Sequence, residues 1–363
     1  MILMNMVTPP PELAAISALQ SKLVSALKPL LPEHALLWEP EDTIPYECDG
    51  LAAYRKMPLA VALPETEEQV AQILKICFEM QIPVVPRGSG TGLSGGAMPI
   101  SQGLVLSLAK LKKIVSIDPF TRTAVVQPGV RNLAISEAVA HLGLYYAPDP
   151  SSQIACSIGG NVNENSGGVH CLKYGLTLHN VLRVRGVLMS GEIVEFGSLA
   201  PDSPGLDLLA IMMGSEGMLA VVTEVTVKLV AKPKLARVIM ASFDDIEKGG
   251  NAVAAIIAAG IIPAGLEMMD KATTRAVEEF VHAGYDLDAA AILLCESDGT
   301  PEEVAEEIAR MTKVLEEAGA SGIQISKDES ERLQFWSGRK NAFPAAGRLA
   351  PDYYCMDGTI PRR

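Results

Sequence analysis

Hydrophobic residues recur along this chain at two spacings, one typical of helices and one typical of strands. Residues 11–31 carry apolar side chains at helical spacing, and prolines 29 and 32 end that pattern. An apolar run at 60–64 predicts a strand. Thr66 and the acidic and amide residues after it then predict the capped start of a helix. The apolar positions of that helix predict a buried stripe at Val70, Ile73, Leu74 and Cys77.

The strands predicted next are short and closely spaced. They fall at 82–85, 104–108, 113–118, 122–127, 181–188 and 192–197, with a helix at 132–142. Strands without a helix after each one favour an α+β layout with a largely mixed sheet. After Lys232-Pro233-Lys234 the pattern changes to strands and helices in regular alternation, as far as a strand at 320–326. This β-α-β rhythm predicts a second, ferredoxin-like domain.

Length and charge limit the classes of function. A chain of 363 residues is long enough for two domains with sizeable cores. The net charge of −13 argues against nucleic acid or an anionic membrane as a general partner, so an anionic substrate would need local cations. The six cysteines form no C-x-x-C pair, which indicates neither a zinc site nor a disulfide framework. The apolar N-terminal residues 1–6 lack the basic region of a signal peptide. The apolar stretch 249–266 is interrupted by Gly260 and Pro263. We expect a soluble protein of a reducing compartment.

Glycine is concentrated in three segments, and the first follows the strand predicted at 82–85. It reads Pro86-Arg87-Gly88-Ser89-Gly90-Thr91-Gly92 and continues to Gly96. Such a backbone can take positive φ and turn several N–H groups inward, an arrangement that binds phosphate. The embedded G-x-G-x-x-G would need a following helix, which Pro99 and Gly103 oppose, and no P-loop lysine follows. A Rossmann site and a P-loop are therefore disfavoured. The alternative interpretation, a glycine-rich hairpin that binds no ligand, is not excluded by this segment alone.

The other two glycine segments lie downstream. The second spans 147–168 and combines serine, asparagine and glycine with almost no charge, which suits a polar ribityl and pyrophosphate surface. A run of surface turns is the alternative. The apolar residues Ile154, Ile158 and Val162 favour a segment that lines the interior. The third segment, 214–224, contains Glu216 and leads into a strand; Glu216 alone could be a solvated turn residue.

Together the segments PRGSGTGLSGG, SIGGNVNENSGG and GSEGMLAVVTE resemble the FAD-linked oxidase family, whose flavin domain vanillyl-alcohol oxidase and para-cresol methylhydroxylase share. The resemblance covers nearly the whole chain and is strongest for the branch that oxidises 2-hydroxy acids. It implies an α+β protein with a two-part PCMH-type FAD-binding domain and a ferredoxin-like cap, or substrate, domain. The boundaries expected from it are a helical segment at 1–55, the FAD-binding domain at 56–233 and a cap domain at 234–363 that is incomplete at its C-terminus.

The resemblance also assigns cofactor-binding residues. The FAD pyrophosphate would lie on the first segment, at Pro86, Arg87, Gly88, Ser89, Gly90, Thr91 and Gly92. The phosphates, ribityl chain and isoalloxazine would be lined by Pro150, Ser151, Ser152, Ser157, Ile158, Gly160, Asn161 and Asn165. The adenosine end would lie near Glu216, Val221 and Val222. Relatives with covalent flavin carry histidine where this chain has Thr91, which implies noncovalent FAD.

The substrate side is less complete. The family binds the substrate carboxylate with an arginine shortly after a tryptophan, and Arg339 after Trp336 matches that pattern; a surface ion pair with nearby glutamates is the alternative. The other late cations are Arg332, Lys340, Arg348, Arg362 and Arg363. The family's catalytic and metal-binding motifs, H-x-G-D-G-N-x-H and G-E-H-G-I-G, do not occur in this sequence, so no metal ligand is assigned and we expect a C-terminally truncated member.

The five histidines do not replace those motifs. His34, His141 and His282 fall on predicted helices or their ends and are interpreted as structural. His170 and His179 flank the second glycine segment. Two interpretations of these histidines remain: a solvated loop position and a position near the flavin.

The function implied is oxidation of a small 2-hydroxy acid, such as glycolate or D-lactate, by hydride transfer to flavin N5. Electrons would pass to a partner subunit or a quinone-side acceptor, within a complex containing a second flavin-domain subunit and an iron–sulfur subunit. We expect a cytoplasmic protein that meets the inner membrane only through such partners. The alternative is a flavin-binding module or assembly subunit without turnover. An NAD-dependent Rossmann dehydrogenase is the weakest hypothesis.

Overall fold

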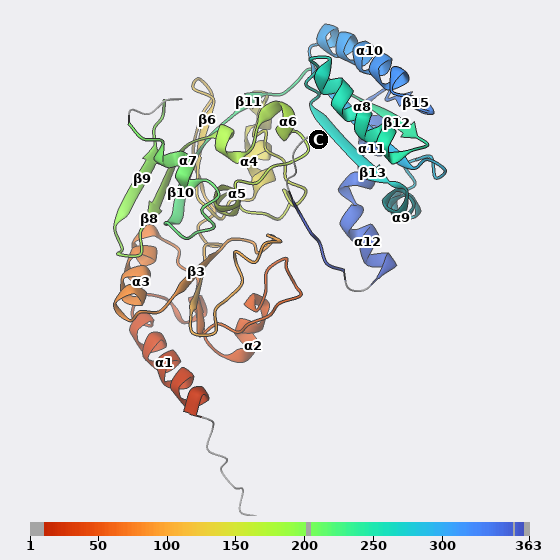
Figure 1. Cartoon of the computed structure of the whole chain (residues 1–363). Helices are drawn as coiled ribbons and strands as arrows, with labels where there is room; N and C mark the ends of the chain where they lie inside the picture. The colour runs from red at the N-terminus through yellow and green to blue at the C-terminus, as the bar shows by residue number, and fades with distance from the viewer. Residues whose placement is uncertain (1–10, 201–204, 351–352, 359–363) are drawn as a thin grey trace, which may run out of the picture. The chain divides into compact units, whose positions relative to one another are not determined.

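The computed structural model describes residues 11–200, 205–350 and 353–358, and it shows an α+β fold (Figure 1). The residues inspected for a signal peptide, 1–6, lie outside these ranges. Two compact units divide the chain, and their segments interleave in sequence. The first unit contains the described residues up to Ala138, Ser152–Ser166 and Val181–Lys228. The second unit contains Val139–Ser151, Gly167–Asn180 and the described residues from Leu229 onward. The domain boundaries expected above stay a prediction.

The first unit contains a four-stranded sheet in the order β1-β2-β4-β3. These strands are β1 (Leu36–Leu37), β2 (Ala60–Ala62), β3 (Val84–Arg87) and β4 (Leu104–Ser107). The helix α3 (Glu67–Glu79) connects β2 to β3, and both of these strands run parallel to β4. A parallel pair requires such a crossover.

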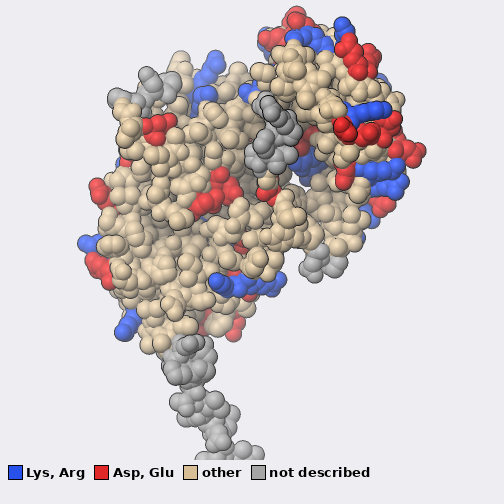
Figure 2. Space-filling model, in the orientation of Figure 1, with Lys and Arg blue, Asp and Glu red and all other residues tan. Residues whose placement is uncertain are grey.

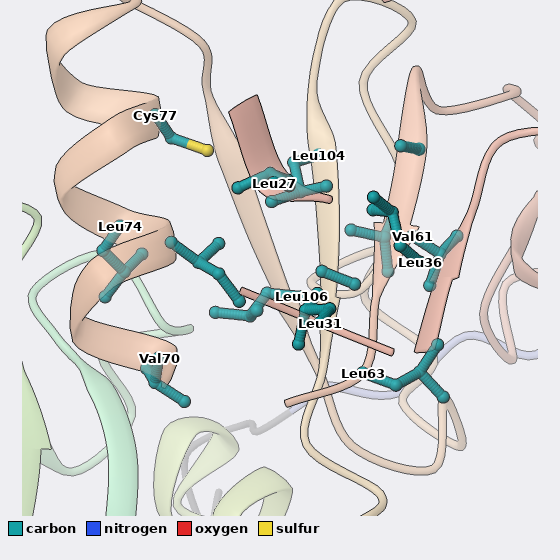
Figure 3. Close-up of a cluster of buried hydrophobic side chains, with 14 of the residues drawn as sticks. Leu27, Leu31, Leu36, Val61, Leu63, Val70, Leu74, Cys77, Leu104 and Leu106 are labelled. Carbon is teal, nitrogen blue, oxygen red and sulfur yellow. The ribbon is translucent and has the colours of Figure 1, made fainter. Parts of the chain in front are cut away.

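The predicted start of α3 is confirmed. The Thr66 hydroxyl accepts a hydrogen bond from Gln69 N at 3.2 Å, and the Gln69 side chain accepts one from Thr66 N at 3.3 Å. The predicted stripe of Val70, Ile73, Leu74 and Cys77 is buried. Figure 3 shows Val70, Leu74 and Cys77 of α3 in the same hydrophobic cluster as Leu104 and Leu106 of β4.

The N-terminal elements complete this hydrophobic cluster. Helix α1 (Pro11–Leu27) buries Leu23 and Leu27 in it, as the helical spacing predicted. The short elements that follow are η1 (Glu33–Ala35), α2 (Pro40–Thr43) and η2 (Ile44–Tyr46).

The other sheet of the first unit is antiparallel, with five strands in the order β5-β6-β10-β8-β9. The strands are β5 (Ile114–Asp118), β6 (Thr123–Val126), β8 (Val181–Val187), β9 (Ile193–Gly197) and β10 (Val221–Lys228). The helices near them in sequence are α4 (Asn132–Val139), α5 (Ile158–Glu164) and α7 (Leu208–Met212). The predicted strands are therefore present, but they form two sheets instead of one mixed sheet. The crossover helix α3 accompanies parallel pairing in the first sheet, whereas in the second sheet short turns join the antiparallel pairs β5–β6 and β8–β9.

The second unit is built around an antiparallel sheet in the order β13-β14-β12-β15. Its strands are β12 (Leu235–Phe243), β13 (Gly265–Asp270), β14 (Ala291–Gly299) and β15 (Gly322–Ile325). Its helices are α8 (Ile246–Ala258), α9 (Lys271–Val281), α10 (Pro301–Glu317), α11 (Glu329–Lys340) and α12 (Ala342–Leu349). This strand order confirms the predicted ferredoxin-like topology.

Both faces of this sheet are covered (Figure 1). Because side chains alternate along a strand, Ile239 and Leu293 pack under α8 and α10, while Val238 and Ile292 pack on the opposite side with α9 and α11. The remaining elements of the unit are η3 (Ala140–Leu142), β7 (Leu144–Tyr145), α6 (Cys171–Tyr174), η4 (Thr177–Asn180) and β11 (Val230–Ala231). Within the described ranges, no helix combines the length and hydrophobicity needed to cross a lipid bilayer.

Candidate functional site

The structure brings the three glycine segments together within the first unit. The third segment hydrogen-bonds to the second through the backbone: Gly214 N donates to Val162 O, and Glu216 N donates to Asn163 O, each at 2.9 Å. The first segment meets the second where the Ser94 hydroxyl donates to the Glu164 carboxylate at 3.2 Å. These contacts join residues 52, 53 and 70 positions apart in sequence, so the three segments form one local structure.

Close approach explains two of the glycines in the first segment, residues 88–96, which we call the glycine loop. A Cβ atom on Gly88 would lie 2.0 Å from the Ser157 hydroxyl oxygen, so no side chain fits there. Gly90 has a φ of +69°, in the left-handed region, and a Cβ there would lie 2.3 Å from the Arg87 guanidinium. The loop thus presents bare backbone at the start of α5.

Three buried polar atoms around the glycine loop lack partners. Ser157 Oγ, Asn163 Oδ1 and Ser215 Oγ have no hydrogen-bond partner anywhere in the described part of the chain. An unsatisfied buried donor or acceptor costs about 1–3 kcal/mol, so such atoms are rare without a ligand or water to satisfy them. All three lie in the second and third glycine segments. Bare backbone with unsatisfied hydroxyl and amide oxygens fits a polar ligand with phosphate and hydroxyl groups.

The second glycine segment is more regular than the sequence indicated. Its residues Ile158–Glu164 form α5, with Ser157 at the N-cap and Asn165 in the left-handed conformation at the C-cap. Ile158 and Val162 are buried as predicted. The prediction was wrong for Ile154, which is 66% exposed because it lies in the turn before the helix.

Asn161 is buried and its amide is bonded inside the fold. Its Oδ1 accepts from the Asn132 side chain at 3.1 Å, and its Nδ2 donates to Cys156 Sγ at 3.4 Å. The Asn161 side chain therefore holds α5 in place, and a cofactor contact of this residue stays a prediction.

Charges near the glycine loop are mostly negative. The guanidinium of Arg87, at the end of β3, donates to Cys48 O at 2.7 Å and lies over the Tyr46 ring. Burial lowers the pKa of Arg87, against the opposing effect of Asp49. Burial also raises the pKa of Glu216, and the nearby carboxylates of Glu164 and Asp49 raise it further. Because the Arg87 guanidinium is bonded to backbone carbonyls, we expect a phosphate group here to be bound by backbone N–H groups.

The remaining predicted cofactor residues fall in both units. Pro86, Thr91, Gly92 and Ser152 are half-buried, Ser89 and Gly160 are exposed, and Val221 and Val222 are buried at the start of β10. Pro150 and Ser151 belong to the second unit, directly after Asp149. Their roles toward a cofactor stay predictions.

Arg339 lies on α11 in the second unit. Its Nε donates to Glu267 Oε2 on β13 at 2.7 Å, and the two side chains are 31% and 23% exposed. The two terminal guanidinium nitrogens have no partner among the residues that the structure describes. Those nitrogens form a fork that matches a carboxylate.

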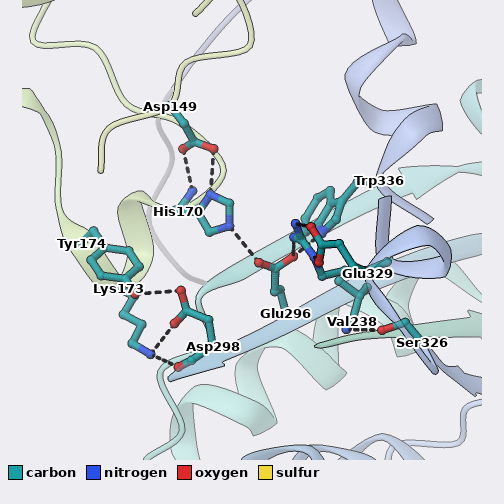
Figure 4. A network of polar contacts seen from close by, with 11 residues as sticks. Asp149, His170, Lys173, Tyr174, Val238, Glu296, Asp298, Ser326, Glu329 and Trp336 are labelled. Carbon is teal, nitrogen blue, oxygen red and sulfur yellow. Dashed lines mark hydrogen bonds and ion pairs between the residues drawn. The ribbon is translucent and has the colours of Figure 1, made fainter. Parts of the chain in front are cut away.

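The sequence did not reveal a polar network around Glu296 that reaches α11, the helix of Arg339 (Figure 4). His170 Nδ1 bonds to Asp149 Oδ2 at 2.7 Å, and its Nε2 bonds to Glu296 Oε1 on β14 at 3.1 Å. Burial alone would lower the pKa of His170, but the hydrogen bonds to both carboxylates outweigh it and raise the pKa to about 10. The His170 side chain is 24% exposed and paired with both carboxylates, which favours the imidazolium form at neutral pH. Of the two interpretations left open above, a solvated loop position does not fit these contacts.

The network continues from Glu296 to α11. Arg332 Nη1 donates to Glu296 Oε2 at 2.8 Å, and the Trp336 indole N–H donates to the same oxygen. Burial would raise the pKa of Glu296, yet the bond to His170 and the charge of Arg332 hold it below its usual value. Two residues further along β14, buried Asp298 binds Lys173 and Tyr174 of α6. The sequence signal for this network was the pair of acids, Glu296 and Asp298, that directly follows the apolar residues 291–295 of one strand.

The other sequence candidates have ordinary surroundings. His34 lies in η1, His141 in η3 and His282 at the C-cap of α9, as predicted. His179 Nδ1 accepts from Leu176 N. Arg348 bonds to the Glu279 carbonyl, and Arg362 and Arg363 lie outside the described residues. Over the described ranges, no group of three or more His, Cys, Asp or Glu side chains is placed to hold a metal ion.

Comparison with known families gives two matches. Residues 58–197 match the family described as FAD binding domain. Residues 232–363 match the C-terminal domain of FAD linked oxidases.

Individual relatives agree with these matches. Glycolate oxidase subunit GlcD of Escherichia coli (strain K12) is 60% identical over 95% of this chain and 69% of its own length. D-lactate dehydrogenase of Anaerostipes hadrus is 32% identical over 88% of this chain and 68% of its own length. Among solved structures, p-cresol methylhydroxylase with substrate bound is 21% identical, with a TM-score of 0.74 over 88% of this chain and 69% of that chain. This last likeness concerns the fold alone.

Proposed function

The chain belongs to the FAD-linked oxidase family, and we propose that it oxidises a small 2-hydroxy acid to the 2-oxo acid. The family makes it an FAD-dependent oxidoreductase. The substrate class rests on its similarity to a glycolate oxidase subunit and to a D-lactate dehydrogenase. The feature of this chain that supports the proposal best is Arg339, because its two terminal guanidinium nitrogens, which have no partner among the described residues, suit a carboxylate.

The glycine loop and its neighbours would hold the FAD. The backbone at Arg87–Gly92 would bind the pyrophosphate, since Gly88 and Gly90 leave no side chain in the way. The unsatisfied Ser157 hydroxyl offers a hydrogen bond to the phosphates or the ribityl chain. Glu216, Val221 and Val222 would lie at the adenosine end. Thr91 carries no nucleophilic ring nitrogen of the kind that joins flavin to protein in relatives with histidine, so the FAD would be held noncovalently.

On the substrate side this chain's own contribution is binding and orientation. Arg339 would bind the substrate carboxylate through its two terminal nitrogens while Glu267 keeps its Nε in place. When bound, FAD supplies the hydride acceptor for the α-carbon. We further propose that the electrons leave to a partner subunit or a quinone-side acceptor, in a complex with a second flavin-domain subunit and an iron–sulfur subunit. We propose a cytoplasmic location, with contact to the inner membrane only through those partners.

The visible spectrum of the purified protein tests the proposal. We expect a flavin spectrum, and acid precipitation should release the flavin into the supernatant because it is not covalently bound. Glycolate or D-lactate added without oxygen should bleach the flavin band. A stable yellow protein that neither acid reduces would contradict the proposed oxidation and favour a flavin-binding module without turnover.

A matched pair of arginine variants tests the role of Arg339. Arg339→Gln should raise the glycolate concentration needed for half-maximal bleaching by about tenfold or more, because a charge-assisted bidentate contact is lost. Arg348→Gln removes the same charge from α12, where the guanidinium bonds to the Glu279 carbonyl and lies over the Phe280 ring, and should leave that concentration unchanged. An equal effect of both substitutions would point to loss of net charge and contradict a specific carboxylate contact.

A further inference from the structure

Glu296 collects hydrogen-bond donors from two separate segments of the second unit (Figure 4). His170, which precedes α6, bonds to Oε1 of its carboxylate. Arg332 and Trp336, one helical turn apart on α11, both donate to Oε2. The Glu296 side chain is only 2% exposed, so these three donors replace its water.

Burying such a carboxylate is costly. Removing an ion from water costs several kcal/mol, and well-packed apolar residues in its place are often as stable or more stable. The neighbouring positions on the same face of β14, Ile292 and Leu294, show that this face accepts apolar side chains. A charge at Glu296 is therefore poorly explained by stability alone, and fixing the position of the groups it bonds is the better-attested use of a buried charge.

The groups that Glu296 fixes belong to the helix that carries Arg339. Trp336 and Arg339 are three residues apart on α11, so they lie on neighbouring turns of one face. Glu296 pairs with Gly265 across the sheet, and Glu267, the partner of Arg339, lies two residues further along the same strand, β13. The Trp336 ring rests against Gly265, where a Cβ would lie 3.3 Å from it. Two acids on adjacent strands thus hold α11 at successive turns.

The other side of the network reaches the second glycine segment. Asp149 bonds to both the backbone N and the ring of His170, at 3.1 and 2.7 Å. Gly168 packs against Asp149 so closely that a Cβ would lie 2.4 Å from its carbonyl carbon. The residues after Asp149 are Pro150 and Ser151, which are predicted to line the cofactor. The imidazolium of His170 is therefore the link between that segment and Glu296.

We propose that Glu296 is a positioning residue for substrate binding, which sets the place of Arg339 through α11 and ties it through His170 to the segment that carries Pro150 and Ser151. This inference rests on the proposed function, because the role of Arg339 in binding a carboxylate comes from it. In this role Glu296 would act through His170, Arg332 and Trp336, which it bonds, and not by contact with the substrate.

Binding of oxalate to the FAD-loaded protein tests this role. Oxalate carries carboxylates but has no hydride to give, so it can be titrated through the change it causes in the flavin spectrum. Glu296→Gln should weaken oxalate binding about tenfold, the scale seen when a ligand residue loses its outer partner. His170→Gln changes a less buried position and should also weaken oxalate binding. This variant replaces Glu296→Gln in the test if Glu296→Gln does not fold.

Asp298→Asn is the matched control. Asp298 lies on the same face of β14, is similarly buried at 4% exposure, and bonds to Lys173 and Tyr174 instead of α11. The Asp298→Asn substitution should lower the melting temperature about as much as Glu296→Gln does. It should leave the oxalate dissociation constant within about twofold of the wild-type value. Equal weakening of oxalate binding by both variants would overturn the proposal, because it would reflect general loosening of the unit.

A double-mutant cycle then asks whether Glu296 acts through Arg339. Once Arg339→Gln has removed the carboxylate contact, Glu296→Gln should weaken oxalate binding little further. Fully additive losses would overturn the positioning role while the proposed function stands. If Arg339→Gln alone leaves oxalate binding and bleaching by glycolate unchanged, the binding role proposed for Arg339 fails, and the positioning role fails with it.

Discussion

At the scale of single residues, glycines and hydroxyls have complementary roles around the glycine loop. Gly88 lets the Ser157 hydroxyl come close to the backbone, and that hydroxyl lacks a partner among the described residues. A polar ligand would supply what the serine lacks and use the backbone that the glycine exposes. The same local structure thus costs stability in the free protein and favours the bound one.

A substitution at Gly90 can test whether the shape of the glycine loop matters for FAD binding, separately from the cost of backbone strain. Its φ of +69° is nearly the same as that of Gly143, at +68°, but only Gly90 has neighbours that a Cβ would hit. Alanine at either position should cost about 1–2 kcal/mol for the left-handed backbone. Gly90→Ala should in addition displace the Arg87 guanidinium and lower the FAD content of the purified protein.

The ratio of flavin to protein absorbance, read beside the melting temperature, separates the two effects. Gly143→Ala should reduce the melting temperature and leave the flavin content unchanged. Equal flavin content in both variants would show that the shape of the loop near Arg87 does not matter for FAD.

Sequence patterns predicted the residues whose role is local. Thr66 and the stripe from Val70 to Cys77 follow from capping and helical spacing, which involve neighbours along the chain. The partner of Arg339 could not be read in this way, because Glu267 lies 72 residues away and meets it only once α11 packs on the sheet. The ionised state of His170 likewise depends on Asp149 and Glu296, which the fold brings to it from both sides.

At the scale of elements, the sequence located most helices and strands to within a few residues. The strand predicted at 82–85 is shifted to Val84–Arg87, because pairing with β4 selects its register. Helix α5 was not predicted, since Gly159, Gly160 and Asn161 favour turns over a helix. It forms because Ile158 and Val162 are buried on one side and Asn161 is bonded to Asn132 and Cys156.

Two helices with the same type of cap offer a prediction at this scale. Thr66 and Thr300 both cap their helices in complete capping boxes, one in each unit. Alanine at either position should cost about 1 kcal/mol of unfolding free energy. Because each unit has its own hydrophobic clusters, we expect each substitution to affect mainly the unit that contains it.

The two tryptophans provide one reporter for each unit. Trp38 packs against the hydrophobic cluster of the first unit, and Trp336 is buried in the second. In urea unfolding, Thr66→Ala should shift the transition seen by Trp38 in a Trp336→Phe background. Thr300→Ala should shift the one seen by Trp336 in a Trp38→Phe background. A common shift of both transitions would show that the units unfold as one.

At the scale of the whole molecule, the strongest feature is a net charge of −13 in a protein whose cofactor and proposed substrates are anions. Side chains of both signs are spread over the face drawn in Figure 2. Around the glycine loop the carboxylates of Asp49, Glu164 and Glu216 lie near the buried Arg87, so the balance of these four side chains is also negative. We therefore expect FAD to approach against repulsion and to be retained by short-range contacts with the backbone.

This predicts an unusual dependence of FAD uptake on salt. Raising the ionic strength from about 0.01 M to 0.15 M shortens the Debye length from about 30 Å to about 8 Å and screens the repulsion. The association rate of FAD with the apoprotein, followed by flavin fluorescence in stopped flow, should therefore rise severalfold. Riboflavin, which lacks the phosphates, should show almost no change and serves as the control. A rate that falls with salt would mean that cations steer FAD to the site, and it would contradict a pyrophosphate site built from backbone N–H groups.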